Sequence, residues 1–401
     1  MKIYFNQPAF DGQLLRVISH TFNGCADIGE CLSTATQIEE GNYQSWYEEW
    51  VRTADRLVKI AKDSEEKGHT VSARETYLRA SNYYRTSLFF HYQLPLLPEV
   101  KETYRQHVLT FDKAMSLYSD NFRKVHIPFE NISMPGYFYK CQTSDGPRPV
   151  IIVNGGYDGT HQEGYYSIIP MMLQRGFHAL TFDGPGQGSL LFEDRLPMRY
   201  DWETVVTPIV NYLEQLPEVK SSQIILYGAS WGGMLAPRAA AFEDRIAALI
   251  TNPGQWDVMT NFKQAFVPED ENTIGDPQQV ENFLQEALKD KHFVRKIHAK
   301  MFVHGIDSPS QLLEEWQNYH LSDVVDKILC PTLVCDAENE PFSTGQAKIF
   351  YDSLSCPKQY HLFTSSYGAG EHCCAGAIGA LSQVIFDWLE ETLEPAHTVG
   401  V

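Results

Sequence analysis

The sequence predicts an α/β protein with a mostly parallel, doubly wound sheet, an N-terminal helical domain and a helical lid insertion. Short apolar runs alternate with helical stretches from residue 149 onward, which is typical of parallel strands covered by helices on both faces. Residues 1–122 show helical periodicity instead. Residues 251–331 separate two successive strand-like runs, a distance too long for one crossover helix.

The N-terminal region, residues 1–122, is predicted to be a helical cap. Apolar residues recur at helical spacing from Tyr43 to Ala61, and a second stripe runs from Ala73 to Leu88. The segment from Ser72 to Glu75 has the pattern of a capping box at the start of the second helix. We therefore expect two antiparallel helices that pack on the rest of the chain.

Residues 123–401 are predicted to form the second domain, with a lid insertion at about 255–322. An antiparallel edge pair is expected at 125–129 and 132–139, with Met134-Pro135-Gly136 as the break between them. The later strands are expected at 150–153, 177–182, 224–227, 246–250, 332–335 and 359–363. The helices are expected at 163–175, 201–216, 232–243, 344–354 and 374–393.

Composition excludes several classes of function. Lys and Arg total 32 against 51 Asp and Glu, and the resulting net charge of −19 disfavours nucleic-acid and membrane-surface partners. The eight cysteines include no C-x-x-C pair, so neither a disulfide framework nor a zinc site is expected. The chain begins without a signal-peptide pattern and has no apolar run long enough to span a membrane. These observations predict a cytoplasmic protein without a metal or cofactor.

The most specific motif is Gly228-Ala229-Ser230-Trp231-Gly232. It follows the apolar run 224–227 and precedes a helical stretch, which is the strand–turn–helix context of a nucleophile elbow. Ser230 is therefore the predicted nucleophile, and the backbone N–H of Trp231 is a predicted oxyanion donor. The alternative is a glycine-rich packing turn without a chemical role.

A serine nucleophile needs a base and an acid that follow it in the chain. His372 ends a glycine-rich loop after the last strand and is the predicted base, whereas His361 lies inside a strand and His397 in the C-terminal tail. The loop after strand 332–335 supplies the acid. Its position favours Glu340, and Glu338 and Asp336 stay open as alternatives.

The turn after strand 150–153 is predicted to supply the second oxyanion donor. Its paired glycines allow close backbone approach to a substrate carbonyl, through the N–H of Gly156 or of Tyr157. Asp158 and Glu163 flank this turn. Their simplest role is capping the helix that begins near Gln162, and the alternative is an auxiliary carboxylate aimed at the substrate.

These motifs together resemble the α/β-hydrolase superfamily, in particular its subgroup with an N-terminal helical domain. That subgroup includes 2,6-dihydroxypseudooxynicotine hydrolase and the fungal pigment-pathway polyketide-shortening hydrolases. The matching stretches are 154–160 with Glu163, 183–188, 228–233, 331–340 and 368–373. The resemblance implies a triad of Ser230, Glu340 and His372, a substrate-facing Asp158, a helical lid and a homodimer. Glu340 departs from the aspartate that is usual in the family.

The predicted function is a serine hydrolase of a small carbonyl compound in secondary or catabolic metabolism. The bond cleaved is an ester, an amide or a β-diketone-type carbon–carbon bond, and the reaction passes through an acyl-enzyme. Two alternatives remain: an acyltransferase or cyclase that uses the same triad, and a non-catalytic binding module on a hydrolase scaffold.

Overall fold

An eight-stranded mixed sheet lies at the centre of the molecule, in a computed structural model that describes residues 1–92, 95–118, 121–142, 146–260, 289 and 291–393. Its strand order is β1-β2-β4-β3-β5-β6-β7-β8. β1 and β2 pair antiparallel, β2 pairs antiparallel with β4, and the remaining neighbours are parallel. The strands are β1 Phe122–Phe129, β2 Ile132–Tyr139, β3 Arg148–Asn154, β4 His178–Phe182, β5 Val219–Ala229, β6 Ile246–Asn252, β7 Thr332–Ala337 and β8 Lys358–Phe363. This architecture confirms the predicted fold class.

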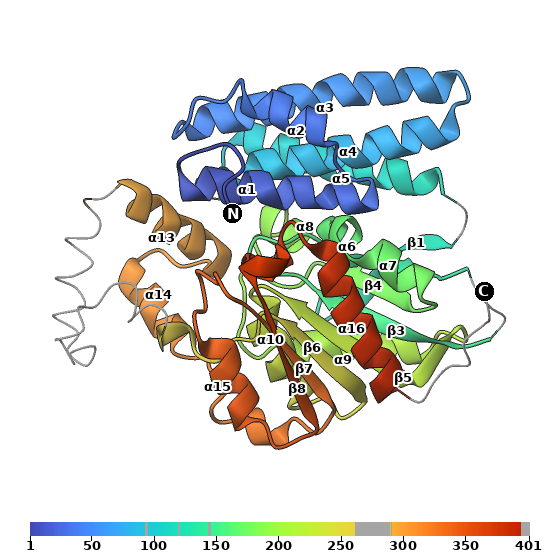
Figure 1. Cartoon of the computed structure of the whole chain (residues 1–401), viewed down its shortest axis with the longest axis vertical. Coiled ribbons are helices and arrows are strands. Elements are labelled where there is room, and N and C mark those ends of the chain that lie inside the picture. Colours follow the sequence, from blue (N-terminus) through green and yellow to red (C-terminus); the bar gives the residue numbers. More distant parts are fainter. Residues whose placement is uncertain (93–94, 119–120, 143–145, 261–288, 290, 394–401) are drawn as a thin grey trace.

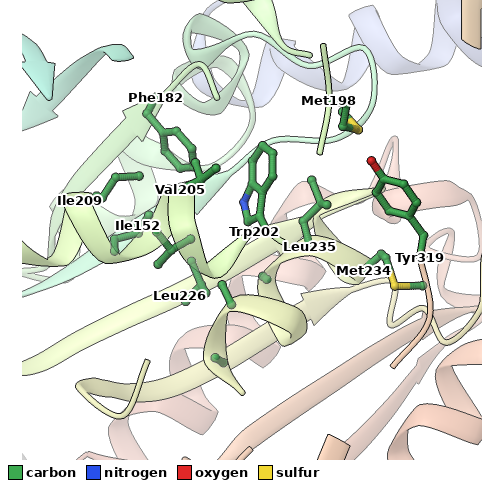
Figure 2. Packing of buried hydrophobic residues seen from close by; sticks show 14 of the residues in the cluster. Ile152, Phe182, Met198, Trp202, Val205, Ile209, Leu226, Met234, Leu235 and Tyr319 are labelled. Atoms are coloured by element: carbon green, nitrogen blue, oxygen red, sulfur yellow. The ribbon is translucent and has the colours of Figure 1, made fainter. Parts of the chain in front are cut away.

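Helices cover both faces of the sheet (Figure 1). Successive side chains of a strand point to opposite faces, so Ile151 and Ile152 of β3 enter different apolar cores. The core of Ile152 includes α8 Gly188–Phe192, α9 Glu203–Glu214, α10 Gly232–Ala240 and α15 Gln346–Ser353. The core of Ile151 includes α6 His161–Ser167, α7 Ile169–Gln174 and α16 Ile378–Thr392. Figure 2 shows the first core, where Trp202 lies among Phe182, Val205 and Leu235.

The N-terminal helices form a layer across one end of the sheet, blue to teal in Figure 1. They are α1 Pro8–Ser19, α2 Ile28–Ala35, α3 Tyr43–Glu66, α4 Thr70–Leu88 and α5 Pro98–Ser116. Their own core contains the fully buried Trp46 and Trp50. α4 lies between this core and the sheet, since every residue from Ser81 to Leu88 is buried. The helical region ends before β1, which begins at Phe122.

The predicted lid insertion is described only in part, because residues 261–288 and 290 lie outside the described residues, as does His397. Its described helices are α13 Lys291–His304 and α14 Pro309–Trp316. α13 contacts the N-terminal layer through Arg295, whose Nε donates to the Phe90 carbonyl at 2.7 Å. Across the described ranges, no helix combines the length and the apolar character needed to cross a membrane. Short 3-10 turns occur at His20–Asn23, Phe89–His91, Val325–Lys327, Ser365–Tyr367 and His372–Cys374.

Three local expectations were wrong. The hairpin between β1 and β2 turns at Glu130, which has φ 48°, and Met134-Pro135-Gly136 lies inside β2. α4 begins at Thr70 after His69, without the expected capping box at Ser72. The single helix expected over 163–175 is two helices, α6 and α7. Proline is favoured in the first turn of a helix, and Pro170 lies in the first turn of α7, which follows a break at Ile168.

Candidate active site

Ser230 lies in the sharp turn between β5 and α10. Its φ of 55° falls in the left-handed region, which a non-glycine residue adopts only where the surrounding structure holds it. Here the Ser230 N–H donates to the Asn252 carbonyl at 2.8 Å, and Gln255 Nε2 donates to the Ser230 carbonyl at 2.8 Å. Gly228 permits the tight turn, because a Cβ there would lie 2.1 Å from the Gly232 carbonyl oxygen. The turn has the strand-to-helix geometry of a nucleophile elbow.

The structure brings the predicted nucleophile, base and acid together in one line. His372 Nε2 is 2.9 Å from Ser230 Oγ, and His372 Nδ1 is 2.6 Å from Glu340 Oε2. His372 lies in the 3-10 turn after β8, and Glu340 lies in the loop after β7. The Glu340 side chain is 2% exposed, and its Oε1 accepts the Phe342 N–H at 2.9 Å. Both carboxylate oxygens are therefore fixed, and one of them is directed at the imidazole.

The two other carboxylates of this loop make different contacts. Asp336 Oδ2 accepts from the Tyr360 hydroxyl at 2.8 Å, and its Oδ1 accepts from the Ala337 N–H at 2.8 Å. Glu338 Oε2 accepts from the Ser365 N–H at 2.6 Å. Of the three carboxylates that the sequence left open, Glu340 is the one that contacts His372.

The surroundings of His372 favour its protonated form. Burial alone would lower the pKa of the imidazole, but the neighbouring Cys373 sulfur and the Glu340 carboxylate raise the pKa well above its usual value. A base of this kind readily holds the proton that it takes from a hydroxyl. The ring orientation is also fixed, since Phe342 packs edge-on against His372 with ring centroids 4.8 Å apart.

The turn after β3 lies against the nucleophile, as a second oxyanion donor requires. A Cβ on Gly156 would lie 2.7 Å from Ser230 Cβ, so only glycine lets the backbone come this close. Gln187 fixes the turn, because its Nε2 donates to the carbonyls of Gly155 and Gly156 at 3.0 and 2.9 Å. The loop that precedes α8 therefore packs on this turn. The rings of Tyr157 and Trp231, the residues that follow Gly156 and Ser230, contact each other with centroids 4.8 Å apart.

Asp158 and Glu163 bind an arginine of the N-terminal layer, and they do not cap α6. The residue that precedes α6 is Thr160, whose side chain makes no capping hydrogen bond, and the His161 N–H at the start of α6 donates to Asp183 Oδ1 at 2.7 Å. Arg16 Nη1 donates to Asp158 Oδ2 at 2.6 Å, and Arg16 Nε donates to Glu163 Oε1 at 2.7 Å. Arg85 Nη2 donates to the same Glu163 oxygen at 2.6 Å. Burial opposes ionisation of Glu163, but these arginines prevail and lower its pKa to about 2.

Sequence reasoning missed four residues that contact Tyr157, Asp158 or Glu163. Arg16 and Arg85 come from helices α1 and α4, and Lys300 and His304 come from α13. The spacing of Lys300 and His304, four positions apart, indicates that they share one face of a helix. It does not indicate which part of the protein that face contacts. Neither arginine belongs to a recognisable local motif. Arg16 is 142 or more positions away in the sequence from the two carboxylates that it binds.

Comparisons with known proteins agree with this architecture. A family model described as FrsA-like esterase matches residues 17–270. Hydrolyase poxO from Penicillium oxalicum is 32% identical over 98% of this chain and 99% of its own. Hydrolase LUC6 from a Fusarium species is 31% identical over 97% of each chain. The relatives therefore match the helical N-terminal region and the sheet region together.

A solved structure has the same fold. The crystal structure of 2,6-dihydroxy-pseudo-oxynicotine hydrolase superposes with a TM-score of 0.74 and 20% sequence identity, over 94% of this chain and 96% of its own. The fold is therefore that of an α/β-hydrolase with an N-terminal helical region. This confirms the resemblance inferred from the motifs.

Proposed function

Because the chain belongs to the FrsA-like esterase family and is a hydrolase of the α/β type, we propose that it cleaves a small carbonyl compound through an acyl-enzyme on Ser230. The observation that carries this proposal is the continuous hydrogen-bonded line from Glu340 through His372 to Ser230 Oγ, with distances of 2.6 and 2.9 Å. The order of these residues in the chain is that of α/β-hydrolases.

In the proposed mechanism, His372 Nε2 removes the Ser230 proton as Oγ attacks the substrate carbonyl carbon. Glu340 holds Nδ1 protonated, so that Nε2 is the basic nitrogen, and stabilises the imidazolium that forms. His372 then returns the proton to the leaving group, and an acyl-enzyme remains on Ser230. Water, activated by the same nitrogen, hydrolyses this ester and restores the serine.

The negative charge on the tetrahedral intermediate needs donors beside Ser230. The Trp231 N–H stands at the start of α10, where the helix dipole favours an anion. The N–H of Gly156 or Tyr157 comes from the turn that lies against Ser230. One such donor contributes about 3 kcal/mol to the transition state. We assign Trp231 with one of the other two residues to the oxyanion hole.

Turnover of activated esters tests this proposal. The full-length chain should hydrolyse 4-nitrophenyl esters, and a fluorophosphonate should inactivate it in proportion to the serine labelled. An added alcohol acceptor distinguishes the acyltransferase alternative, since transfer products would then exceed the free acid. Absence of both turnover and labelling would contradict the proposal and favour a binding module.

Carbon–carbon hydrolysis is the second candidate, and the position of Asp158 favours it. Asp158 follows Tyr157 on the oxyanion turn, and Arg16 fixes its carboxylate at 2.6 Å. Cleavage of a ketone leaves a carbanion or enolate that must be protonated, whereas 4-nitrophenolate leaves without a proton. We propose that His372, protonated when Ser230 attacks, supplies this proton, and that the Asp158 carboxylate, ion-paired with Arg16, accepts a hydrogen bond from the substrate and so orients the leaving group for the transfer.

Asp158→Asn tests that role. It should lower cleavage of a β-diketone by about 10²-fold and hydrolysis of a 4-nitrophenyl ester by far less, since proton transfer limits only the first reaction. Rates on both substrates measure the effect. Arg16→Met is the control, because it removes the ion pair of Asp158 but keeps the Asp158 carboxylate. Equal losses on the two substrates would show that Asp158 is structural.

A further inference from the structure

A cluster of aromatic rings covers the turn after β3, which holds Gly156, and the turn at Ser230. Beside the Tyr157–Trp231 contact, the Tyr157 ring lies 5.6 Å from the His304 ring between centroids. Tyr319 lies 5.4 Å from both His304 and Trp231. The cluster thus joins the residues that follow Gly156 and Ser230 to the helical insertion, and it borders the position where a substrate carbonyl would bind.

Four buried polar groups of this cluster have no hydrogen-bond partner among the described residues, and besides the hydroxyls of Tyr157 and Tyr319 they are two N–H donors. Trp231 Nε1 and His304 Nδ1 are buried, and neither has a hydrogen-bond partner among the described residues. Trp316 Nε1 donates to His304 Nε2 at 3.2 Å, which leaves the ring proton on Nδ1 in the neutral imidazole. Burial keeps the ring neutral, since it lowers the pKa of His304 to about 3. A buried donor without a partner is unfavourable by about 1–3 kcal/mol unless a ligand satisfies it.

Lys300 adds a positive charge to the same cluster. Its Nζ lies 4.6 Å from the centroid of the Tyr157 ring and 5.3 Å from that of Trp316. Within the described part of the chain, Lys300 makes no ion pair. The carboxylate that acts on its charge, Asp158, is already bound to Arg16 at 2.6 Å. A partly buried ammonium without a counter-ion suggests that a ligand supplies one.

We propose that Lys300 Nζ, Trp231 Nε1 and His304 Nδ1 form a subsite that binds a deprotonated oxygen of the substrate, either a carboxylate or an enolate. All three groups are donors, so the subsite selects an acceptor, and the ammonium selects a charged one. The substrate class is then an acidic carbonyl compound whose anionic oxygen lies near the scissile carbonyl. This inference rests on the proposed hydrolase function of Ser230.

A matched pair of esters tests the subsite in the full-length enzyme. 4-Nitrophenyl hemiglutarate carries a carboxylate where 4-nitrophenyl valerate ends in a methyl group. Lys300→Met should lower kcat/KM for the hemiglutarate at least tenfold and change it for the valerate less than twofold. Dimedone, which is an enolate at neutral pH, serves as the second probe. If the subsite prefers an enolate, the inhibition constant of dimedone should be at least tenfold higher for Lys300→Met than for the wild type.

Lys296→Met is the matched control, because Lys296 is exposed one turn away on α13. Lys296→Met should change neither the preference for the hemiglutarate over the valerate nor the inhibition constant of dimedone. Unaltered selectivity in Lys300→Met for both the carboxylate and the enolate would overturn the subsite, and so would an equal loss in Lys296→Met. Retained valerate turnover shows in each case that the variant is folded. If the wild type neither hydrolyses the valerate nor is labelled by a fluorophosphonate, the proposed function itself is overturned.

The pH dependence of selectivity gives a second readout. Burial lowers the pKa of Lys300 to about 8, helped by Lys296 and opposed by Asp158. His304 faces the same ammonium but stays neutral. The charge is present below this pKa and lost above it, so preference for the hemiglutarate should fall as pH rises through about 8. Lys300→Arg should keep the preference at higher pH, and a wild-type preference that does not fall would contradict the subsite.

Discussion

Ser230→Ala is expected to lower kcat by about 10⁴-fold or more, with the fold intact. Alanine removes Oγ, which lies 2.9 Å from His372 Nε2, but it keeps the Cβ and thus the same backbone conformation at φ 55°. Initial rates on a 4-nitrophenyl ester measure the loss, and thermal unfolding shows that the variant is folded. The residual rate should resist fluorophosphonates.

Ser353→Ala is the control for this variant. Ser353 ends α15, and its hydroxyl donates to the Ile349 carbonyl at 2.9 Å. Its replacement should leave kcat within about twofold of wild type, as is usual for a surface substitution. A Ser230→Ala enzyme that turns over esters within tenfold of wild type would show that another residue is the nucleophile.

Glu340→Gln should lower kcat by about 10³- to 10⁴-fold, because it disturbs the tautomer of His372. A glutamine has one carbonyl oxygen for two donors, the Phe342 N–H and the His372 Nδ1–H. If the amide NH₂ faces Nδ1, the ring carries its proton on Nε2 and cannot accept from Ser230. Glu338→Gln, in the same loop, should change kcat less than about threefold.

The pH profile of Glu340→Gln separates this role from a structural one. The Glu340 carboxylate contributes to the raised pKa of His372, so its neutralisation should lower that pKa. The rise of kcat/KM with pH should then begin at a lower pH than in wild type. An unshifted acid limb, or a larger loss in Glu338→Gln, would mean that Glu340 is not the acid.

The sequence predicts the nucleophile and the base because both are set by local chain geometry. A G-x-S-x-G segment between a strand and a helix allows one compact turn, and it holds Ser230 above the sheet. His372 follows from its position after the last strand. For the acid, position in the loop after β7 favours Glu340 but leaves Glu338 and Asp336 open, and the directions of the three side chains distinguish them. Asp336 turns to Tyr360, Glu338 to Ser365 and Glu340 to His372.

Contacts between distant segments could not be predicted. Asp158 and Glu163 precede and begin a helix, which favours a capping role, yet Arg16 binds both from a helix more than 140 positions away. The two arginines outweigh capping, since a bidentate pair with carboxylate is the stronger contact. No pattern within a sequence window contains this information.

The predicted position of the turn in the β1–β2 hairpin was wrong for a different reason. Proline lacks an N–H and is usually excluded from inner strands, so Pro135 indicates a break. The Pro135 carbonyl accepts from the Asp183 N–H at 2.9 Å, and this residue therefore faces the side of β4. β4 ends at Phe182, opposite Gly136, so the missing N–H removes no ladder hydrogen bond there. The turn lies instead at Glu130.

Covalent trapping tests the central claim, that Ser230 forms the acyl-enzyme, most directly. The full-length chain is incubated with a fluorophosphonate, its intact mass is measured, and the modified peptide is sequenced by tandem mass spectrometry. One adduct per chain, located on Ser230 and absent from Ser230→Ala, is the predicted result. An adduct on another residue, or equal labelling of Ser230→Ala, would contradict it.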